Sequence, residues 1–549
     1  MALLVDLFGF LSVLLRGLAL ALAAFAIGGV VFRYAVITPR GAAGPALLSR
    51  LGAFQGIAAA ALVAVLLLAK GLDLSILVST VGVPWSSALT APFVLAGFLT
   101  CLAGAGLAVC AYRGGNAPPA RPWLEGLAAC VLLASVVATT HATGRVEARA
   151  WLLAISFLHQ AAGAAWIGGL PYFLLVLAAA LPAGERATFA HRYSRVCVVA
   201  VAAIFASAAG KYIEYLGVPD AVYGTAYGLM TATKAVMFAA LLAFGAGNYR
   251  AVRRMMVSDA ATRRTRRFVE VELAIGVGLF FVAGSLTSLP PAVDLPDDRV
   301  TWQAIVERVL IPKLPRLHSP DHSELWYETE QARLDMRAAQ AREEAPRAFV
   351  PGAGILYERS AADIAWSEYN HNWSGVFVCA IGVLALLARW PRFAWARHWP
   401  MVFVVLGVFI AIRADPESWP LGTIGFFEAF REPGVVQHRL MTLLVIVFGL
   451  FEWRVRVGGL ATTRAVYVFP LTNVLGGILM LTHSHVLENI QEALLIEMSH
   501  IPIGVLAIAA GSARWLELRA DPPIRARAAR VWPVAFLLIG LVLMFYREA

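Results

Sequence analysis

Long apolar stretches recur from one end of this chain to the other, and they restrict the folds that it can adopt. The first covers residues 7–32, and comparable stretches follow at short intervals. A run of about 18 apolar residues can cross a bilayer as a helix, and backbone polar groups in lipid must be paired inside a helix or a closed barrel. With 60% hydrophobic and 15% charged residues, the sequence predicts an all-α, polytopic integral membrane helical bundle.

The sequence contains about fourteen candidate spans of this kind. The first lacks a basic start and is too long for a signal-peptide core, so we expect it to remain as a membrane helix. The expected spans have the approximate ranges 7–32, 52–70, 88–111, 123–142, 149–180, 192–215, 222–249, 267–289, 371–388, 398–413, 438–453, 465–483, 489–512 and 531–546.

Arginines predict which side of the membrane each loop faces. They crowd the loop between 249 and 267, as Arg250, Arg253, Arg254, Arg263, Arg264, Arg266 and Arg267. Cytoplasmic loops collect Lys and Arg, and the alternate loops of this chain follow the same pattern. Both termini are therefore expected on the outer side. The same rule accounts for the net charge of +10 without a nucleic-acid partner.

The spans and loops predict three regions. Residues 1–290 form an N-terminal membrane region of about eight spans. Residues 291–370 form a small, polar outer segment, and residues 371–549 form a histidine-rich membrane region of about six spans.

Histidines gather on the predicted outer side of the membrane. Seven of the eleven map to the outer half of the membrane region: His141, His159, His371, His438, His483, His485 and His500. Imidazole suits copper, zinc and iron, and metal ligands commonly converge from facing helices of a bundle. We predict a shared outer metal or haem site of His438, His500 and one of His483 and His485, with His371 as a fourth candidate. A single histidine at a helix end is otherwise an interfacial polar residue.

The pair His483 and His485 constrains the geometry of that site. On an ideal helix, residues two apart point about 200° apart, so both can serve one site only if the helix has ended there. Asn489 and Glu492 continue the stripe of His485 at i+4 and i+7, and their oxygens can accept a hydrogen bond from an imidazole N–H.

Two charged residues in the N-terminal region are expected inside the membrane. Lys234 falls near mid-depth of the seventh span, and Glu272 enters the eighth span from the inner side. Their depths differ by about 10 Å or more, so no ion pair between them is expected. The glycine-rich "WIGGL", Trp166–Leu170, is typical of close helix packing.

The cysteines and methionines of this chain do not form a recognisable series of sulfur ligands for Cu(I). The five cysteines include no CxxC pair and all fall in predicted spans, so neither disulfides nor thiolate metal sites are expected. The eleven methionines are scattered, with no methionine-rich outer cluster.

Four segments between residues 158 and 292 carry an ordered set of motifs: "LHQAAGAAWIGGLPYF", "HRYSRVCVVAVAAIFASAAG", "TAYGLMTATKAVMFAALLAFGAGNYR" and "RFVEVELAIGVGLFFVAGSLTSLPPA". They resemble the copper-resistance protein D (CopD) family, with His159, Trp166, Lys234 and Glu272 at motif positions. The resemblance implies a bacterial inner-membrane protein of copper homeostasis, which moves copper from periplasm to cytoplasm beside a periplasmic, copper-binding CopC-like partner. Both termini would then be periplasmic. The C-terminal region resembles extensions of longer members.

Two other functions stay open at this point. One is a b-type haem protein or membrane oxidoreductase, because the same helices look distantly like the HemJ-type protoporphyrinogen oxidase and two facing histidines also suit haem. The other is a factor for metalloenzyme assembly. No nucleophile–base constellation or phosphate-binding loop appears, so the sequence favours a transporter or metal-binding protein over an enzyme.

Overall fold

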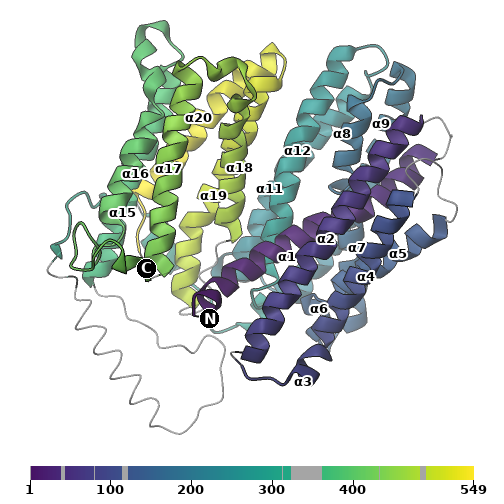
Figure 1. Cartoon of the computed structure of the whole chain (residues 1–549), viewed down its shortest axis with the longest axis horizontal. Helices are drawn as coiled ribbons and strands as arrows, with labels where there is room; N and C mark the ends of the chain where they lie inside the picture. Colours follow the sequence, from purple (N-terminus) through teal and green to yellow (C-terminus); the bar gives the residue numbers. More distant parts are fainter. Residues whose placement is uncertain are drawn as a thin grey trace. The chain divides into compact units, whose positions relative to one another are not determined.

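The computed structural model describes residues 2–38, 44–79, 81–113, 122–311, 313–322, 325, 361–431, 433–482 and 490–548. Within these ranges the chain is built from helices, and its β structure is limited to one isolated bridge between Ser418 and Ile424. It divides into two compact units (Figure 1). The first holds residues 1–222 and 227–296, and the second holds residues 223–226 and 297–549.

The first unit is a bundle of long helices with short helices between them. Its main helices are α1 (Ala2–Val31), α2 (Pro45–Ser79), α4 (Pro92–Arg113), α5 (Pro122–Val137), α7 (Arg149–Trp166), α8 (Leu170–Ala178), α9 (Ala183–Tyr215), α11 (Ala226–Val252) and α12 (Asp259–Leu286). Short helices α3 (Trp85–Leu89), α6 (His141–Gly144) and α10 (Asp220–Gly224) complete it. Helix α1 packs against α2, α7 and α12.

The second unit is a smaller helical bundle. Its helices are α13 (Trp302–Ile305), α15 (Ala361–Leu387), α16 (Met401–Arg413), α17 (Pro433–Val457), α18 (Val468–Thr482), α19 (Ile490–Arg519) and α20 (Pro522–Met544). Helix α20 packs against both α15 and α19. At the centre, Phe469 meets Trp399 and Trp532 edge to face, and the two tryptophan rings are tilted against each other. The guanidinium of Arg456 lies 4.5 Å from the centre of the Trp399 ring.

The all-α polytopic membrane bundle is confirmed. Among the described residues, twelve helices are long and apolar enough to cross a membrane. The other two expected spans also correspond to helices. Helix α5 is apolar but has only 16 residues, and α17 has 25 residues but carries four charged side chains, Arg439, Glu452, Arg454 and Arg456.

The fifth span is broken where the "WIGGL" sequence lies. Helix α7 ends at Trp166 and α8 begins at Leu170. A Cβ atom on Gly168 would lie 2.0 Å from the carbonyl oxygen of Ala24, so only glycine lets α1 approach so closely. The prediction that this sequence permits close packing is confirmed.

Two helix boundaries differ from those expected. Helix α15 begins at Ala361, about ten residues earlier than the predicted span, because Ala365 and Trp366 bury apolar surface there. His371 therefore lies well inside the helix instead of opening it. His141 does not end the fourth span either, since α5 stops at Val137 and His141 begins α6. The predicted three-region division stays a prediction, because residues 326–360 lie outside the described ranges.

Candidate functional site

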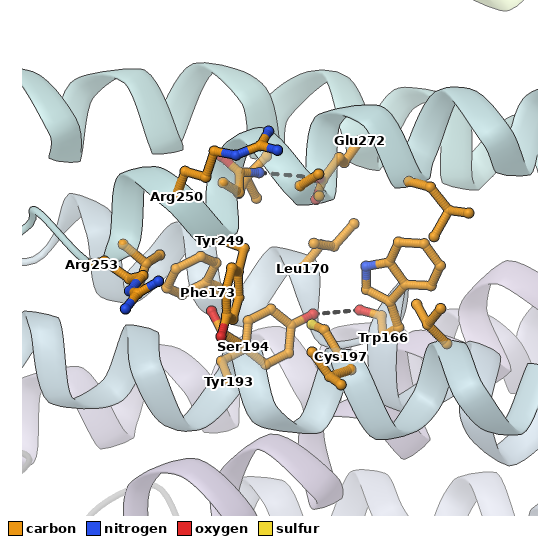
Figure 2. Close-up of a pocket in the computed structure, with 18 residues that line it drawn as sticks. Trp166, Leu170, Phe173, Tyr193, Ser194, Cys197, Tyr249, Arg250, Arg253 and Glu272 are labelled. Atoms are coloured by element: carbon orange, nitrogen blue, oxygen red, sulfur yellow. Dashed lines mark hydrogen bonds between the residues drawn. The ribbon is translucent and has the colours of Figure 1, made fainter.

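A cavity of about 510 Å³ lies in the first unit, lined by residues of α8, α9, α11 and α12 and by the last residue of α7 (Figure 2). Most of its lining is apolar, as expected inside a membrane bundle. Its polar and aromatic groups include Trp166, Tyr193, Cys197, Asn248 and Glu272, together with Arg250 and Arg253.

The carboxylate of Glu272 is the most unusual group in this cavity. Its side chain is only 3% exposed. Asn248 Nδ2 donates a hydrogen bond of 2.9 Å to Glu272 Oε1, across from α11 to α12. Asn248 Oδ1 is buried and has no hydrogen-bond partner in the part of the chain that the structure describes. Ionisable groups inside a membrane are costly and are typically kept for function. Asn248 was not predicted as a site residue, although it lies in the "NYR" of a quoted motif.

The broken fifth span forms another side of the cavity. The hydroxyl of Tyr193 donates to the carbonyl oxygen of Trp166, where α7 ends and its carbonyls lose their helical partners. The Trp166 ring meets Phe238 edge to face, with ring centres 5.7 Å apart. Cys197 follows Tyr193 by one helical turn, so both side chains face the same way. The cavity therefore brings a thiol and a carboxylate to one apolar chamber.

Two arginines line the far end of the cavity. Figure 2 shows Arg253 at the opposite end of the cavity from Trp166. Arg250 lies in the last turn of α11 and Arg253 directly follows this helix, in the arginine-rich loop region that the sequence predicts to be cytoplasmic. The cavity thus extends from the middle of the bundle toward the predicted inner face.

His159 lies on α7, two turns before the cavity. Its Nδ1 is 2.9 Å from Ser207 Oγ on α9. The Ser207 hydroxyl donates its own hydrogen to the carbonyl of Ala203 at 2.7 Å, so it must accept from His159. A neutral His159 consequently carries its hydrogen on Nδ1 and its lone pair on Nε2. Imidazoles held in this way are the usual form of a metal ligand.

Lysines surround His159. Both Lys211 on α9 and Lys234 on α11 lie within electrostatic range of its ring. Lys211 and Ser207 were not predicted as site residues, although Lys211 is an ionisable residue inside a predicted span, the same signal that singled out Lys234.

His141 lies apart from both groups. Its Nε2 is 3.4 Å from the carbonyl oxygen of Leu286, and its ring meets Tyr215 and Tyr227 with centres 6.4 and 6.2 Å away. Burial lowers the pKa of His141 below its ordinary value. The surroundings of His141 therefore favour a neutral imidazole.

The second unit brings two of the predicted C-terminal histidines together. The rings of His371 on α15 and His500 on α19 have centres 6.1 Å apart. His438 on α17 instead places its Nδ1 2.6 Å from Asp415 Oδ1. His483, His485 and Asn489 lie outside the described residues, as does the side chain of Glu492. The predicted shared site therefore stays a prediction.

A larger cluster of metal-binding groups is not present in the ranges that the structure covers. There, no three residues among His, Cys, Asp and Glu are arranged so that they could hold one ion. Any metal bound by the described residues must therefore use two such side chains or add other donors.

Comparison with known proteins identifies part of the first unit. Residues 187–286 match the family model described as Copper resistance protein D. No curated protein and no solved structure matches the chain. The match is narrower than the predicted 158–292, since it begins within α9, after the helix that carries His159 and Trp166. It covers most of α9 and the helices α11 and α12, which supply Tyr193, Cys197, Asn248 and Glu272 to the cavity. The chain is thus a multi-pass membrane protein whose residues 187–286 match the family model of copper resistance protein D (CopD).

Proposed function

We propose that this protein is an inner-membrane copper-handling protein that moves copper from the periplasm to the cytoplasm through its first unit. One observation carries the proposal: the helices that match the copper-resistance family line a cavity with a half-buried thiol, Cys197, and a buried carboxylate, Glu272. The sequence alone predicts no thiolate metal site, so the thiol is a ligand that only the cavity suggests. Thiolate, imidazole and carboxylate groups are all ligands for copper ions.

The depths of the polar groups support a path across the bundle. His159 lies about ten residues after the start of α7, which is roughly 15 Å along the helix axis at 1.5 Å per residue. Trp166 ends the same helix about 10 Å further on. Cys197, Asn248 and Glu272 follow around the cavity, and Arg253 lies at its far end. Copper would pass from His159 to these groups in turn.

Charge also bears on the direction of movement. A membrane potential that is negative inside favours inward movement of a cation by about 2.3 kcal/mol per charge per 100 mV. Lys211 and Lys234 lie near His159, and in their protonated form they repel a cation at the outer half of the path. An ionised Glu272 attracts the ion further along the path.

Copper uptake into cells or proteoliposomes tests the proposal. The Glu272→Gln variant keeps the shape of the side chain and removes its charge, so uptake should fall about tenfold, equivalent to ~1.4 kcal/mol. Glu270→Gln is the matched control on the same helix, because Glu270 is paired with Arg267 at 2.7 Å and does not line the cavity. Full uptake in Glu272→Gln would contradict the proposed path.

The visible spectrum of the same purified protein tests the alternative that it binds haem. A b-type haem bound to His159 would give a red protein with a Soret band, which His159→Ala would remove. A colourless protein that binds copper supports copper handling instead. A periplasmic CopC-like protein is proposed as the copper donor, on the strength of the family match alone.

A further inference from the structure

Two histidines and a tyrosine meet near one end of the second unit. His371 lies on α15, His500 on α19, and Tyr546 just after α20, which packs against both of those helices. The two imidazole planes are inclined at 79°, with ring centres 6.1 Å apart. The Tyr546 ring stacks on His371 at 4.1 Å and meets His500 edge to face at 5.9 Å. This grouping joins helices that are far apart in the sequence.

Hydrogen bonds fix which nitrogen of His371 carries the lone pair. Its Nδ1 is 2.8 Å from the backbone carbonyl oxygen of Ser367, one turn earlier on the same helix. A carbonyl can only accept, so Nδ1 donates and a neutral ring has its lone pair on Nε2. A backbone carbonyl on the other ring nitrogen is the usual way in which a metal-binding imidazole is oriented. The Nδ1 of His500 lies 3.2 Å from Ser499 Oγ.

We propose that His371 and His500 form a two-histidine copper site in the second unit, distinct from the cavity of the first. The identity of the metal rests on the proposed function. Metal–imidazole bonds of about 2.0–2.1 Å place an ion roughly 3.2 Å from each ring centre. Ring centres 6.1 Å apart match the separation expected for one shared ion at a wide N–metal–N angle, with one nitrogen of each ring turned toward it. Cu(I) accepts two ligands at such an angle, and tetrahedral ions such as Zn²⁺ require more ligands.

A carboxylate supports this site without entering it. Glu548 Oε2 accepts a hydrogen bond of 2.9 Å from the Tyr546 hydroxyl and another from the hydroxyl of Ser367. These contacts hold the Tyr546 ring against His371. They also place a negative charge close to the pair, which favours a bound cation.

The position of the Tyr546 ring favours a bare ion over a haem as the ligand of the two histidines. A porphyrin held by both histidines would lie flat between the two imidazoles and extend well beyond them. The Tyr546 ring stacks on His371 and meets His500 edge to face, so a porphyrin between the two imidazoles would have to displace it. A bare ion needs no such displacement. His483 and His485 lie outside the described residues, so the predicted four-histidine site stays a prediction.

Copper content of the purified full-length chain tests the site. After loading with Cu(I) and removal of weakly bound metal, His371→Ala and His500→Ala should each lose one equivalent of copper. The double variant should lose no more than either single variant, because both residues hold the same ion. His398→Ala is the control in the same unit, since His398 accepts a hydrogen bond from Trp453 and should retain all copper. Full copper in either single variant, or a loss of two equivalents in the double variant, overturns the proposal.

Two further measurements serve as controls for this test. His371→Gln and His500→Gln keep a polar side chain and separate loss of a ligand from failure to fold. The X-ray absorption spectrum of copper in the wild type, minus the spectrum of a variant, should show nitrogen neighbours and no sulfur. Sulfur neighbours in this difference would contradict the site. If Glu272→Gln leaves copper uptake unchanged while the histidine variants still lose copper, the proposed path is wrong and the two-histidine site is supported. If the histidine variants keep their copper while Glu272→Gln blocks uptake, the two-histidine site is wrong and the proposed path is supported.

Discussion

Single residues in the first unit are oriented by a partner on a neighbouring helix. His159 depends on Ser207, whose hydroxyl accepts from Nδ1 and donates to Ala203. Asn248 orients Glu272 in the same way. Such partners usually matter nearly as much as the ligands themselves. The chemistry of the proposed path therefore depends on residues that would never bind copper directly.

The role of Ser207 can be measured against that of His159. We expect His159→Ala to abolish copper-dependent growth or copper content, and Ser207→Ala to weaken copper binding about 10-fold to 100-fold, because the imidazole loses its orienting acceptor. Ser207→Thr should restore most of the binding. Thr188→Ala and His191→Ala are controls on the same helix, with both side chains exposed. Similar, mild effects in all variants would contradict the role of His159.

The neutral state of His141 has a consequence for stability. Burial lowers its pKa in the folded protein, whereas an unfolded histidine titrates near pH 6.5. As the pH falls from about 7 to about 5, the unfolded state binds a proton before the folded state does, so stability is lost on acidification. His141→Asn should show a smaller acid-induced fall in thermal midpoint. His191→Asn, at an exposed position, should behave like the wild type, and equal acid sensitivity in all three proteins would remove His141 as the cause.

At the scale of helices, close packing depends on glycine where backbones touch. Gly168 meets the backbone of α1, and a Cβ atom on Gly375 of α15 would lie 2.2 Å from the backbone nitrogen of Met544 on α20. The Gly375 contact lies one turn beyond His371. Helix α20 therefore ends close to α15, which brings Tyr546 to the histidine pair.

A single methyl group tests this packing. Gly168→Ala should lower the free energy of unfolding by about 1–3 kcal/mol, since backbone atoms of α1 cannot move aside. Gly163→Ala, on the preceding helix α7, has no atom within 4 Å of the added Cβ. It should be neutral or slightly stabilising, because alanine favours a helix over glycine by roughly 1 kcal/mol. Thermal unfolding in detergent distinguishes the two, and equal midpoints would show that α1 can shift.

At the scale of the whole molecule, the arginine distribution predicts which loops face the cytoplasm. Two highly exposed positions lie on opposite predicted sides: Val257 is 88% exposed and Leu314 is 90% exposed. In intact spheroplasts, an impermeant thiol reagent should label Leu314→Cys and leave Val257→Cys unlabelled. Both should react after lysis. Labelling of Val257→Cys before lysis would reverse the topology, and with it the direction of the proposed path.

The sequence by itself determined the membrane helices, because hydrophobic length is a local property that each segment carries alone. It also indicated the copper-resistance family and the close packing at Gly168. Only the tertiary structure decided which polar groups meet. Depth can be counted along a helix, but the rotation of each helix sets the direction of its side chains, and that rotation follows from packing against neighbours. For this reason His438 faces Asp415, His371 meets His500, and Asn248 with Ser207 emerged only once the helices were placed together.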